Sequence, residues 1–241
     1  MPRIARGQSG GVFTHVINRG NGGWPVFHDE DDYRAFVALL GEACERVAMR
    51  IAACCLMPNH FHLVVWPREE GDLSRWMQWL MTSHVRRHHR RYGSYGHVWQ
   101  GRFKSFLVQR RRVPAEVAAR GVLERDPVMR VVRYAERNPV RAGLVDSAEQ
   151  WRWSSMHWHI EPSSAPRFWS GGYVHRPDDW LACVNRPQTD AELAALRRCI
   201  ARGRPFGTAN WIKRIAAEHG LESTLRPRGR PRKPAKSSLS P

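Results

Sequence analysis

Two apolar segments separated by a Pro-Asn pair constrain the fold of this chain more than any other feature. Residues 49–57 (MRIAACCLM) and 60–66 (HFHLVVW) are apolar and have the length of strands. Pro58 and Asn59 between them favour a turn. The sequence therefore predicts a β-hairpin here, and the segments around it decide which sheet the hairpin joins.

The flanking segments alternate between strand and helix patterns. Strand patterns are found in residues 10–20 and 97–109, and apolar residues recur at helical spacing in residues 28–47 and 72–93. The order strand, helix, strand, strand, helix, strand predicts an α+β, ferredoxin-like (RRM-like) fold, in which helices pack on one face of an antiparallel sheet. The other face is then open for a ligand.

The starts of the two expected helices carry capping signals. Residues 28–47 have an acidic first turn, which suits the positive end of a helix dipole. Residues 72–93 open with Asp72 or Ser74 as the N-cap, and they end in a dense group of arginines and histidines.

The charge balance narrows the partners of this chain. Its 241 residues include 39 Lys and Arg against 22 Asp and Glu, a formal net charge of +17. A polyanion is the natural partner of such a protein. The sequence has neither an apolar run long enough to span a bilayer nor the apolar centre of a signal peptide, so we expect a cytoplasmic protein without a membrane segment. Five cysteines without a CxxC pair favour free thiols in a reducing compartment.

The hairpin contains a His-Phe-His triplet that needs a separate explanation. Because side chains alternate across a strand, His60 and His62 should point to one face, and Phe61 and Leu63 to the other. Two neutral imidazoles side by side can bind one divalent metal ion if another element supplies a third ligand. The alternative is a pair of half-buried, hydrogen-bonded histidines, and the triplet alone leaves both interpretations open.

A second group of candidate functional residues lies in the helix pattern of residues 126–138. Asp126 can cap this helix, with Pro127 at its first position and Pro139 stopping it after Asn138. Tyr134 and Asn138 lie one turn apart on the flank of the apolar stripe. A tyrosine hydroxyl beside cations could attack a phosphate that a metal ion polarises. The alternative is a boundary tyrosine whose ring packs while its hydroxyl stays in water.

Several separated segments together resemble one known family. MPNHFHLVVWP (57–67) is similar to the histidine-hydrophobe-histidine motif of the HUH single-strand DNA endonucleases, and RYAERNPVRAGLV (133–145) to the tyrosine helix of the single-tyrosine, IS200-like transposases. FTHVINRGN, HVWQGRFKSFLV and WRWSS also resemble the REP-associated members of this group. The resemblance covers about residues 1–160.

This resemblance implies a reaction and roles for particular residues. It implies that His60 and His62 hold Mg²⁺ or Mn²⁺ and that Tyr134 is the nucleophile. Asn138 occupies the place of a third metal ligand, for which Glu136 or a water could substitute. Family members cut single-stranded DNA, leave a 5′-phosphotyrosine and a free 3′-OH, and can reverse the reaction on another strand. REP-associated members typically act at palindromic hairpins, and some single-tyrosine relatives are dimers that exchange the tyrosine helix, so a homodimer is one expectation.

Basic residues supply the expected contacts with DNA phosphates. Two dense clusters, VRRHHRRYG (85–93) and QRRR (109–112), predict such contacts, although a solvated helix end explains the first equally well. Trp99, Phe103 and Phe106 interleave with cations as a base-stacking platform does, with core packing as the alternative for the rings. In the first 160 residues the expected DNA-contacting side chains are Arg86, Arg87, Arg90, Arg91, Arg102, Lys104, Arg130, Arg133 and Arg137.

The chain changes character after about residue 160. We expect an endonuclease domain in residues 1–160 and a small helical DNA-binding appendage in residues 161–225, for which a helix-turn-helix is one form. Residues 226–241 form a basic tail, in which Arg228 and Arg230 frame the core of an AT-hook. The alternative for the tail is a disordered segment with only nonspecific affinity.

Two other classes of function compete with the transposase interpretation. The first is a DNA-binding regulator that keeps the fold without cutting, although His60, His62 and Tyr134 are all present. The second is an RNA-binding module, which would leave the histidine pair unexplained and would need exposed aromatic residues on a sheet face. A nicking assay on DNA and RNA separates the three.

Overall fold

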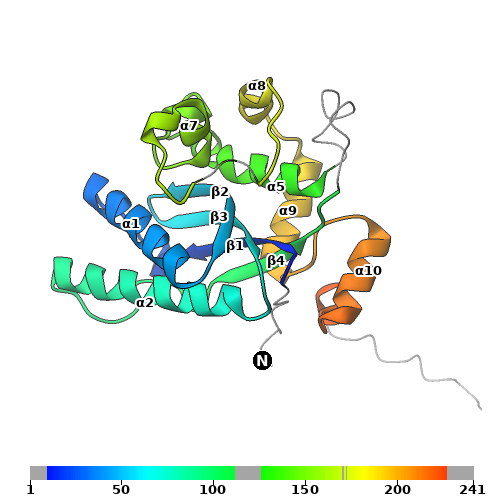
Figure 1. Ribbon diagram of the computed structural model, residues 1–241, viewed down its shortest axis with the longest axis horizontal. Helices are drawn as coiled ribbons and strands as arrows, with labels where there is room; N and C mark the ends of the chain where they lie inside the picture. Colours follow the sequence, from blue (N-terminus) through cyan, green and yellow to red (C-terminus); the bar gives the residue numbers. More distant parts are fainter. Residues whose placement is uncertain (1–9, 112–125, 170, 172, 227–241) are drawn as a thin grey trace, which may run out of the picture.

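An antiparallel sheet with the strand order β2-β3-β1-β4 forms the centre of the protein (Figure 1). The computed structural model describes residues 10–111, 126–169, 171 and 173–226. Its strands are β1 (Phe13–Arg19), β2 (Met49–Met57), β3 (His60–Pro67) and β4 (Lys104–Val108). The predicted α+β class and the predicted order of strands and helices are confirmed.

The predicted hairpin forms as the sequence indicated. Pro58 and Asn59 make the turn between β2 and β3, and Met57 pairs with His60 on its two sides. In β3, Phe61 and Leu63 are fully buried in the cluster that faces α1 and α2, as the alternation predicted. β4 is shorter than the predicted strand 97–109, because residues 97–103 run as a loop with one isolated bridge, from Trp99 to Gly20 just after β1.

Two long helices cover the Phe61 side of the sheet. Helix α1 (Glu30–Arg46) begins after Asp29, whose carboxylate accepts the backbone N–H of Asp32, so the acidic first turn caps its own helix. Helix α2 (Asp72–Tyr92) lies beside α1 on the same face (Figure 1).

The predicted cap of α2 is wrong in detail. Asp72 is the first helical residue and Ser74 lies inside the first turn, while Gly71 takes the capping position with a φ of 83°. The left-handed backbone at this position favours glycine, which has no Cβ to clash. Asp72 still stabilises the turn before the helix, because its carboxylate accepts a hydrogen bond from the backbone N–H of Glu69 at 2.8 Å.

The opposite face of the sheet is covered, so the expectation of an open face is wrong. Helices α5 (Pro127–Glu136), α8 (Trp180–Asn185) and α9 (Asp190–Arg202) lie on this side (Figure 1), and the short helix α6 (Asn138–Arg141) follows α5 there and contacts β2. The side chains of α5, α8 and α9 share one hydrophobic cluster with sheet residues such as Val64 and Val108. The histidine face therefore lies between the sheet and a second helical layer, which the pattern of residues 11–109 could not show.

Helix α5 ends two residues earlier than predicted. Asp126 caps it through the N–H of Val128, as expected, but the regular helix stops at Glu136. The short helix α6 restarts at Asn138 with Pro139 in its first turn. Proline has no N–H to donate to the carbonyl four residues back, so the chain breaks before it and begins again with proline at a tolerated position.

The remaining elements connect the second layer to the sheet edge. Helix α7 (Ser155–Ile160) precedes a loop segment, and helix α10 (Ala209–Glu218) packs on β4 through a cluster that includes Leu107. Short 3₁₀ turns occupy Asn21–Gly23, Ala148–Gln150, Pro162–Ser164 and Glu222–Thr224. Residues from Val174 to Phe206 share a core with the sheet, while the predicted boundary at residue 160 stays a prediction about independent folding.

Among the helices of the described part of the chain, none is long and apolar enough to cross a membrane. All five cysteines are free thiols, as predicted, and four of them are buried.

Candidate active site

Histidine and tyrosine rings meet on the α5 side of the sheet. His60 and His62 lie on β3 with ring centroids 5.0 Å apart, and His15 reaches them from β1. The ring centroid of Tyr134, on α5, is 5.6 Å from that of His62 and 6.3 Å from that of His15. The structure thus brings the predicted nucleophile beside the predicted metal pair within one chain.

His15 is a site residue to which the sequence pattern assigned no role. Its Nε2 lies 3.0 Å from Nδ1 of His62, in a hydrogen bond whose donor depends on the tautomer. When His62 carries its proton on Nδ1, that N–H donates to His15 and leaves a lone pair on Nε2 of His62. The signal was a histidine within the apolar alternation of residues 13–17, but only the strand register, with Ile17 opposite His62, places it here.

Two asparagines hold the ring of His60, one at each nitrogen. Nδ1 of His60 lies 2.7 Å from Oδ1 of Asn59, and this N–H donates because an amide oxygen can only accept. Nε2 then accepts from Nδ2 of Asn138 at 3.2 Å. Oδ1 of Asn138 accepts from Arg141 at 2.8 Å. Asn138 therefore lies beside His60, where a third ligand is needed, and Arg141 orients its amide.

Arg141 also contacts the predicted nucleophile. Its guanidinium carbon lies 4.3 Å from the centre of the Tyr134 ring, and its other terminal nitrogen donates to Gln188 at 3.1 Å. A cation over an aromatic face is attracted to it, and this one would also favour a negative phosphate at the tyrosine. Arg141 follows Asn138 by three residues, a spacing that shares one helix face, but the break at residue 137 hid the relation.

Burial keeps the three histidines neutral near pH 7. It lowers the pKa of His15 to about 3 and that of His60 to about 4, with Arg19 and Arg141 adding to the effect on His60. Burial, His15 and His60 also hold the pKa of His62 well below its ordinary value. Neutral imidazoles retain a lone pair, which a metal ligand requires.

Glu136 does not lie in this site. Its carboxylate is fully buried on another side of α5 and accepts from Ser155 at 2.6 Å, Arg176 at 2.7 Å and Trp180 at 2.8 Å. Since these three donors occupy both oxygens, the suggestion that Glu136 could replace Asn138 as a ligand is wrong. Glu136 instead joins α5 to the segment of residues 155–180.

Arg133 and Arg137, which we expected to contact DNA, are buried against α8 instead. Arg133 donates to the carbonyl oxygens of Cys183 and Arg186, each at 2.7 Å. Arg137 donates to Val184 at 2.9 Å and to Asn185. The last carbonyls of a helix have no partners within it and carry its negative dipole end, so two guanidiniums are favourable there. These arginines hold α8 and do not face a phosphate.

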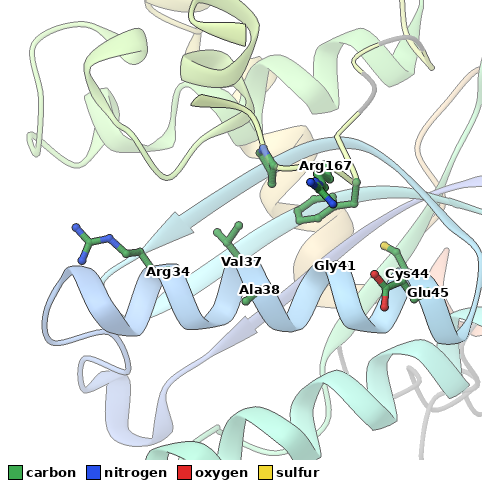
Figure 2. A pocket seen from close by; sticks show the side chains of 9 residues that line it. Arg34, Val37, Ala38, Gly41, Cys44, Glu45 and Arg167 are labelled. Atoms are coloured by element: carbon green, nitrogen blue, oxygen red, sulfur yellow. The ribbon is translucent and has the colours of Figure 1, made fainter. Parts of the chain in front are cut away.

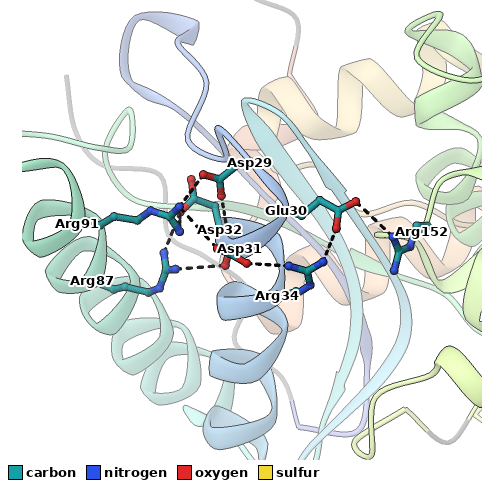
Figure 3. A network of polar contacts seen from close by, with 8 residues as sticks. All are labelled: Asp29, Glu30, Asp31, Asp32, Arg34, Arg87, Arg91 and Arg152. Carbon is teal, nitrogen blue, oxygen red and sulfur yellow. Dashed lines mark hydrogen bonds and ion pairs between the residues drawn. The ribbon is translucent and has the colours of Figure 1, made fainter.

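Two arginines of the basic end of α2 are also committed within the fold. Arg87 donates to Asp32 at 2.9 Å, and Arg91 donates to Asp29 at 2.6 Å. Figure 3 shows these arginines facing the acidic start of α1. Because Asp32 is almost fully buried, its carboxylate needs these partners. Their structural role is the contact between α1 and α2.

Four of the other expected DNA-contacting residues are exposed, and a fifth is half-buried. Arg86 and Arg90 are exposed on α2, and Arg102 and Lys104 are exposed at the start of β4. Arg130 is half-buried, with its guanidinium 5.1 Å from the ring of Phe206. Since α2 packs on the Phe61 face, Arg86 and Arg90 lie across the sheet from the histidines.

The aromatic platform predicted around β4 is part of the core. Trp99, Phe103 and Phe106 are all buried, so the core-packing alternative is correct for these three rings. Arg228 and Arg230 of the AT-hook core lie outside the described residues, and that expectation stays a prediction.

A pocket elsewhere in the fold does not belong to the histidine site. It has a volume of about 530 Å³ and lies between α1 and residues 166–168 (Figure 2). One wall is formed by α1, which covers the Phe61 face of the sheet, and neither histidine nor asparagine lines the pocket. The candidate reaction centre is therefore the His15–Tyr134 cluster on the other face.

Comparison with known proteins identifies the sheet segment. The family described as "Transposase IS200 like" matches residues 11–118, which contain all four strands and both predicted metal-binding histidines but end before Tyr134. A curated Haemophilus influenzae protein, named as a candidate REP-associated tyrosine transposase, is 22% identical over 152 residues. The aligned residues cover 58% of this chain and 78% of that relative.

Two solved structures are also similar to this chain. A REP-associated tyrosine transposase bound to a REP hairpin is 19% identical with a TM-score of 0.46, covering 73% of this chain and 92% of its own. A candidate transposase from Deinococcus radiodurans R1 is 17% identical with a TM-score of 0.36, covering 45% and 87%. Residues 11–118 are thus similar to the IS200-like transposases, and the predicted resemblance to the REP-associated tyrosine transposases is confirmed.

Proposed function

We propose that this protein is a transposase that cuts and rejoins single-stranded DNA with Tyr134 as the nucleophile, at palindromic hairpins of the REP kind. The observation that carries the proposal is the position of Tyr134, 5.6 Å between ring centroids from His62 and under the guanidinium of Arg141. A tyrosine beside paired neutral histidines and a cation has the surroundings that attack on a phosphodiester needs. The net charge of +17 suits a DNA partner.

His60 and His62 would hold Mg²⁺ or Mn²⁺, with Asn138 as the third protein ligand. The donor set fits, because both imidazoles are neutral and each can offer Nε2 while its Nδ1–H donates to a neighbour. In the part of the chain that the structure describes, no group of three His, Cys, Asp or Glu side chains is arranged to hold a metal ion, so the remaining ligands would be amide, water or phosphate oxygens. Since the nitrogen of Asn138 faces His60, its amide must turn over to ligate.

Different residues of the chain have different roles in the proposed reaction. When bound, the metal ion would withdraw charge from a non-bridging phosphate oxygen. The oxygen of Tyr134 attacks the phosphorus and loses its proton to solvent, while the 3′-oxygen of the preceding nucleotide leaves and takes up a proton to become a 3′-OH. Arg141 stabilises the negative charge beside the ring. The phosphotyrosine bond conserves the energy of the cleaved bond, so a free 3′-OH can reverse the step without a nucleotide cofactor.

The proposal predicts a covalent adduct that depends on a metal ion. The test incubates a labelled single-stranded oligonucleotide, carrying a palindrome that flanks the gene, with the full chain and Mn²⁺ or Mg²⁺. A denaturing gel should show the label at the mass of protein plus DNA fragment. EDTA should remove this band, and His60→Ala should reduce its rate of formation by at least about 100-fold, since one of two imidazole ligands is lost.

A matched control separates metal loss from loss of fold. His97→Ala changes an exposed histidine outside the cluster and should leave adduct formation unchanged. If the wild-type chain binds the hairpin in EDTA and in Mn²⁺ but forms no adduct in either, it acts as a DNA-binding regulator and not as a nuclease. An adduct on structured RNA of the same sequence, and none on DNA, would favour the RNA alternative.

His15 should act on the metal through His62. In the variant His15→Phe the ring can keep its contacts with Phe106 and Tyr134, but Nδ1 of His62 loses its acceptor. Without this partner the tautomer and the ring orientation of His62 are less well held, so we expect Mn²⁺ affinity, measured by electron paramagnetic resonance, to fall about 10- to 100-fold. His97→Phe is the control. Unchanged Mn²⁺ affinity in His15→Phe would limit His15 to core packing.

A further inference from the structure

We propose that Trp24 is a stacking platform for one unpaired base of the DNA, next to the phosphate that Tyr134 attacks. The proposal deepens the function proposed above, on which it rests for the identity of the DNA. Trp24 is 75% exposed, whereas most tryptophans of the described residues are buried or half-buried. An exposed indole on the surface of a strongly basic protein is an unusual use of a large apolar ring.

One edge of the indole lies against its own loop, and most of the side chain is open to solvent. A Cβ placed on Gly22 would lie 2.8 Å from both Cδ1 and Nε1 of Trp24, so the ring lies directly against the backbone of that glycine. Gly22 also has a φ of 62°, a conformation that other residues rarely adopt. Two reasons therefore require glycine at position 22: the closeness of the indole and the left-handed backbone. The indole ring is presented to solvent.

The loop that carries Trp24 is held firmly to the rest of the fold. The N–H of Gly20 donates to Asn59 at 2.8 Å, and the N–H groups of Val26 and Phe27 both donate to Pro58, at 2.8 and 3.1 Å. The N–H of Trp24 itself donates to Asn21 at 3.1 Å. Because backbone bonds fix both ends of the loop, little conformational freedom is lost when a base stacks on the ring.

Asn59 connects this loop to the reaction centre. Its amide nitrogen donates to the carbonyl of Gly23 at 2.8 Å, and its amide oxygen accepts from Nδ1 of His60 at 2.7 Å. One side chain thus bridges the residue before Trp24 and a predicted metal ligand. Only two hydrogen bonds separate the platform from the site where the phosphate must lie.

The charge beside Trp24 favours a nucleotide over an apolar protein segment. Arg19 is the cross-strand partner of His60, and its guanidinium lies against Gly23, with Nη2 3.5 Å from a Cβ placed there. A cation for the phosphate and an aromatic ring for the base, side by side, are the two contacts that single-stranded DNA sites combine. Every base has a flat face, so this contact would be tolerant of sequence.

The test measures DNA binding without cleavage. Fluorescence anisotropy in EDTA follows a labelled hairpin oligonucleotide with a single-stranded foot, and a set of oligonucleotides removes one base at a time while keeping its phosphate. We expect Trp24→Ala to bind about tenfold more weakly than the wild-type chain, and Trp24→Phe to recover most of this loss because it keeps a ring. Tyr95→Ala, which removes an exposed tyrosine (96%) on the loop after α2, is the matched control and should bind normally.

The base-removal series identifies the occupant of the platform. One abasic position in the foot should weaken wild-type binding about tenfold and should have no further effect on Trp24→Ala, because both changes remove the same contact. Equal binding by Trp24→Ala and wild type, or an abasic effect that persists in Trp24→Ala at every position, would overturn the stacking proposal. These titrations contain no metal ion and do not involve strand cleavage. Absence of the covalent adduct in the gel assay would therefore refute the proposed nuclease activity without changing the outcome of the stacking test.

Discussion

Replacing Tyr134 with phenylalanine should abolish the covalent protein–DNA adduct. The change removes one oxygen atom and keeps the ring that packs against His15, His62 and Arg141. Because phenylalanine has no hydroxyl to attack phosphorus, we expect adduct formation to fall by at least about 1,000-fold. Hairpin binding in EDTA should stay within about twofold of the wild type, since the phosphate contacts remain. The measurement is the denaturing-gel assay, combined with mass spectrometry of the peptide that carries the nucleotide.

An exposed tyrosine elsewhere in the chain provides the control. Tyr95→Phe alters a tyrosine that is 96% exposed on the loop after α2, and its adduct should form at the wild-type rate. A nucleotide-bearing peptide that contains another tyrosine, or an adduct that persists in Tyr134→Phe, would show that the nucleophile is a different residue. The contact between Arg141 and the ring would then serve only packing.

Replacing Glu136 with alanine should destabilise the protein more than any surface change. The carboxylate and the guanidinium of Arg176 are both almost fully buried, 2.7 Å apart, and Ser155 and Trp180 donate to the same carboxylate. Alanine leaves the buried cation of Arg176 without its anion, which costs about 3–5 kcal/mol of the free energy of unfolding. Urea denaturation followed by circular dichroism measures this loss as a lower midpoint.

Two further variants show whether the cost comes from the unpaired charge. Glu218→Ala removes an exposed partner of Arg214, 3.7 Å away, and should change the free energy of unfolding by less than about 0.5 kcal/mol. The double variant Glu136→Leu with Arg176→Met removes both buried charges and should recover a large part of the loss. A loss below about 1 kcal/mol in Glu136→Ala would contradict a buried ion pair at this place.

The corrections found in the structure share one physical cause. Arg133 and Arg137 look like any exposed cations of an amphipathic helix, yet they are buried because the last carbonyls of α8 need donors. Glu136 looks like a spare ligand beside Tyr134, yet Arg176, forty residues later, binds it. In each case the partner is distant in sequence, and helical periodicity describes only which face of a helix a residue occupies, not what meets that face.

The sequence by itself determined the order of strands and helices, the hairpin at Pro58 and Asn59, and the shared face of His60 and His62. These features follow from local periodicity and turn chemistry, which depend only on residues that are close together in the sequence. Only the tertiary structure decided that a second helical layer covers the histidine face, that His15 and Asn59 hold the two histidines, and that Arg141 lies over Tyr134. Those contacts depend on strand register and on helices packed from distant segments, and neither is encoded in a local pattern.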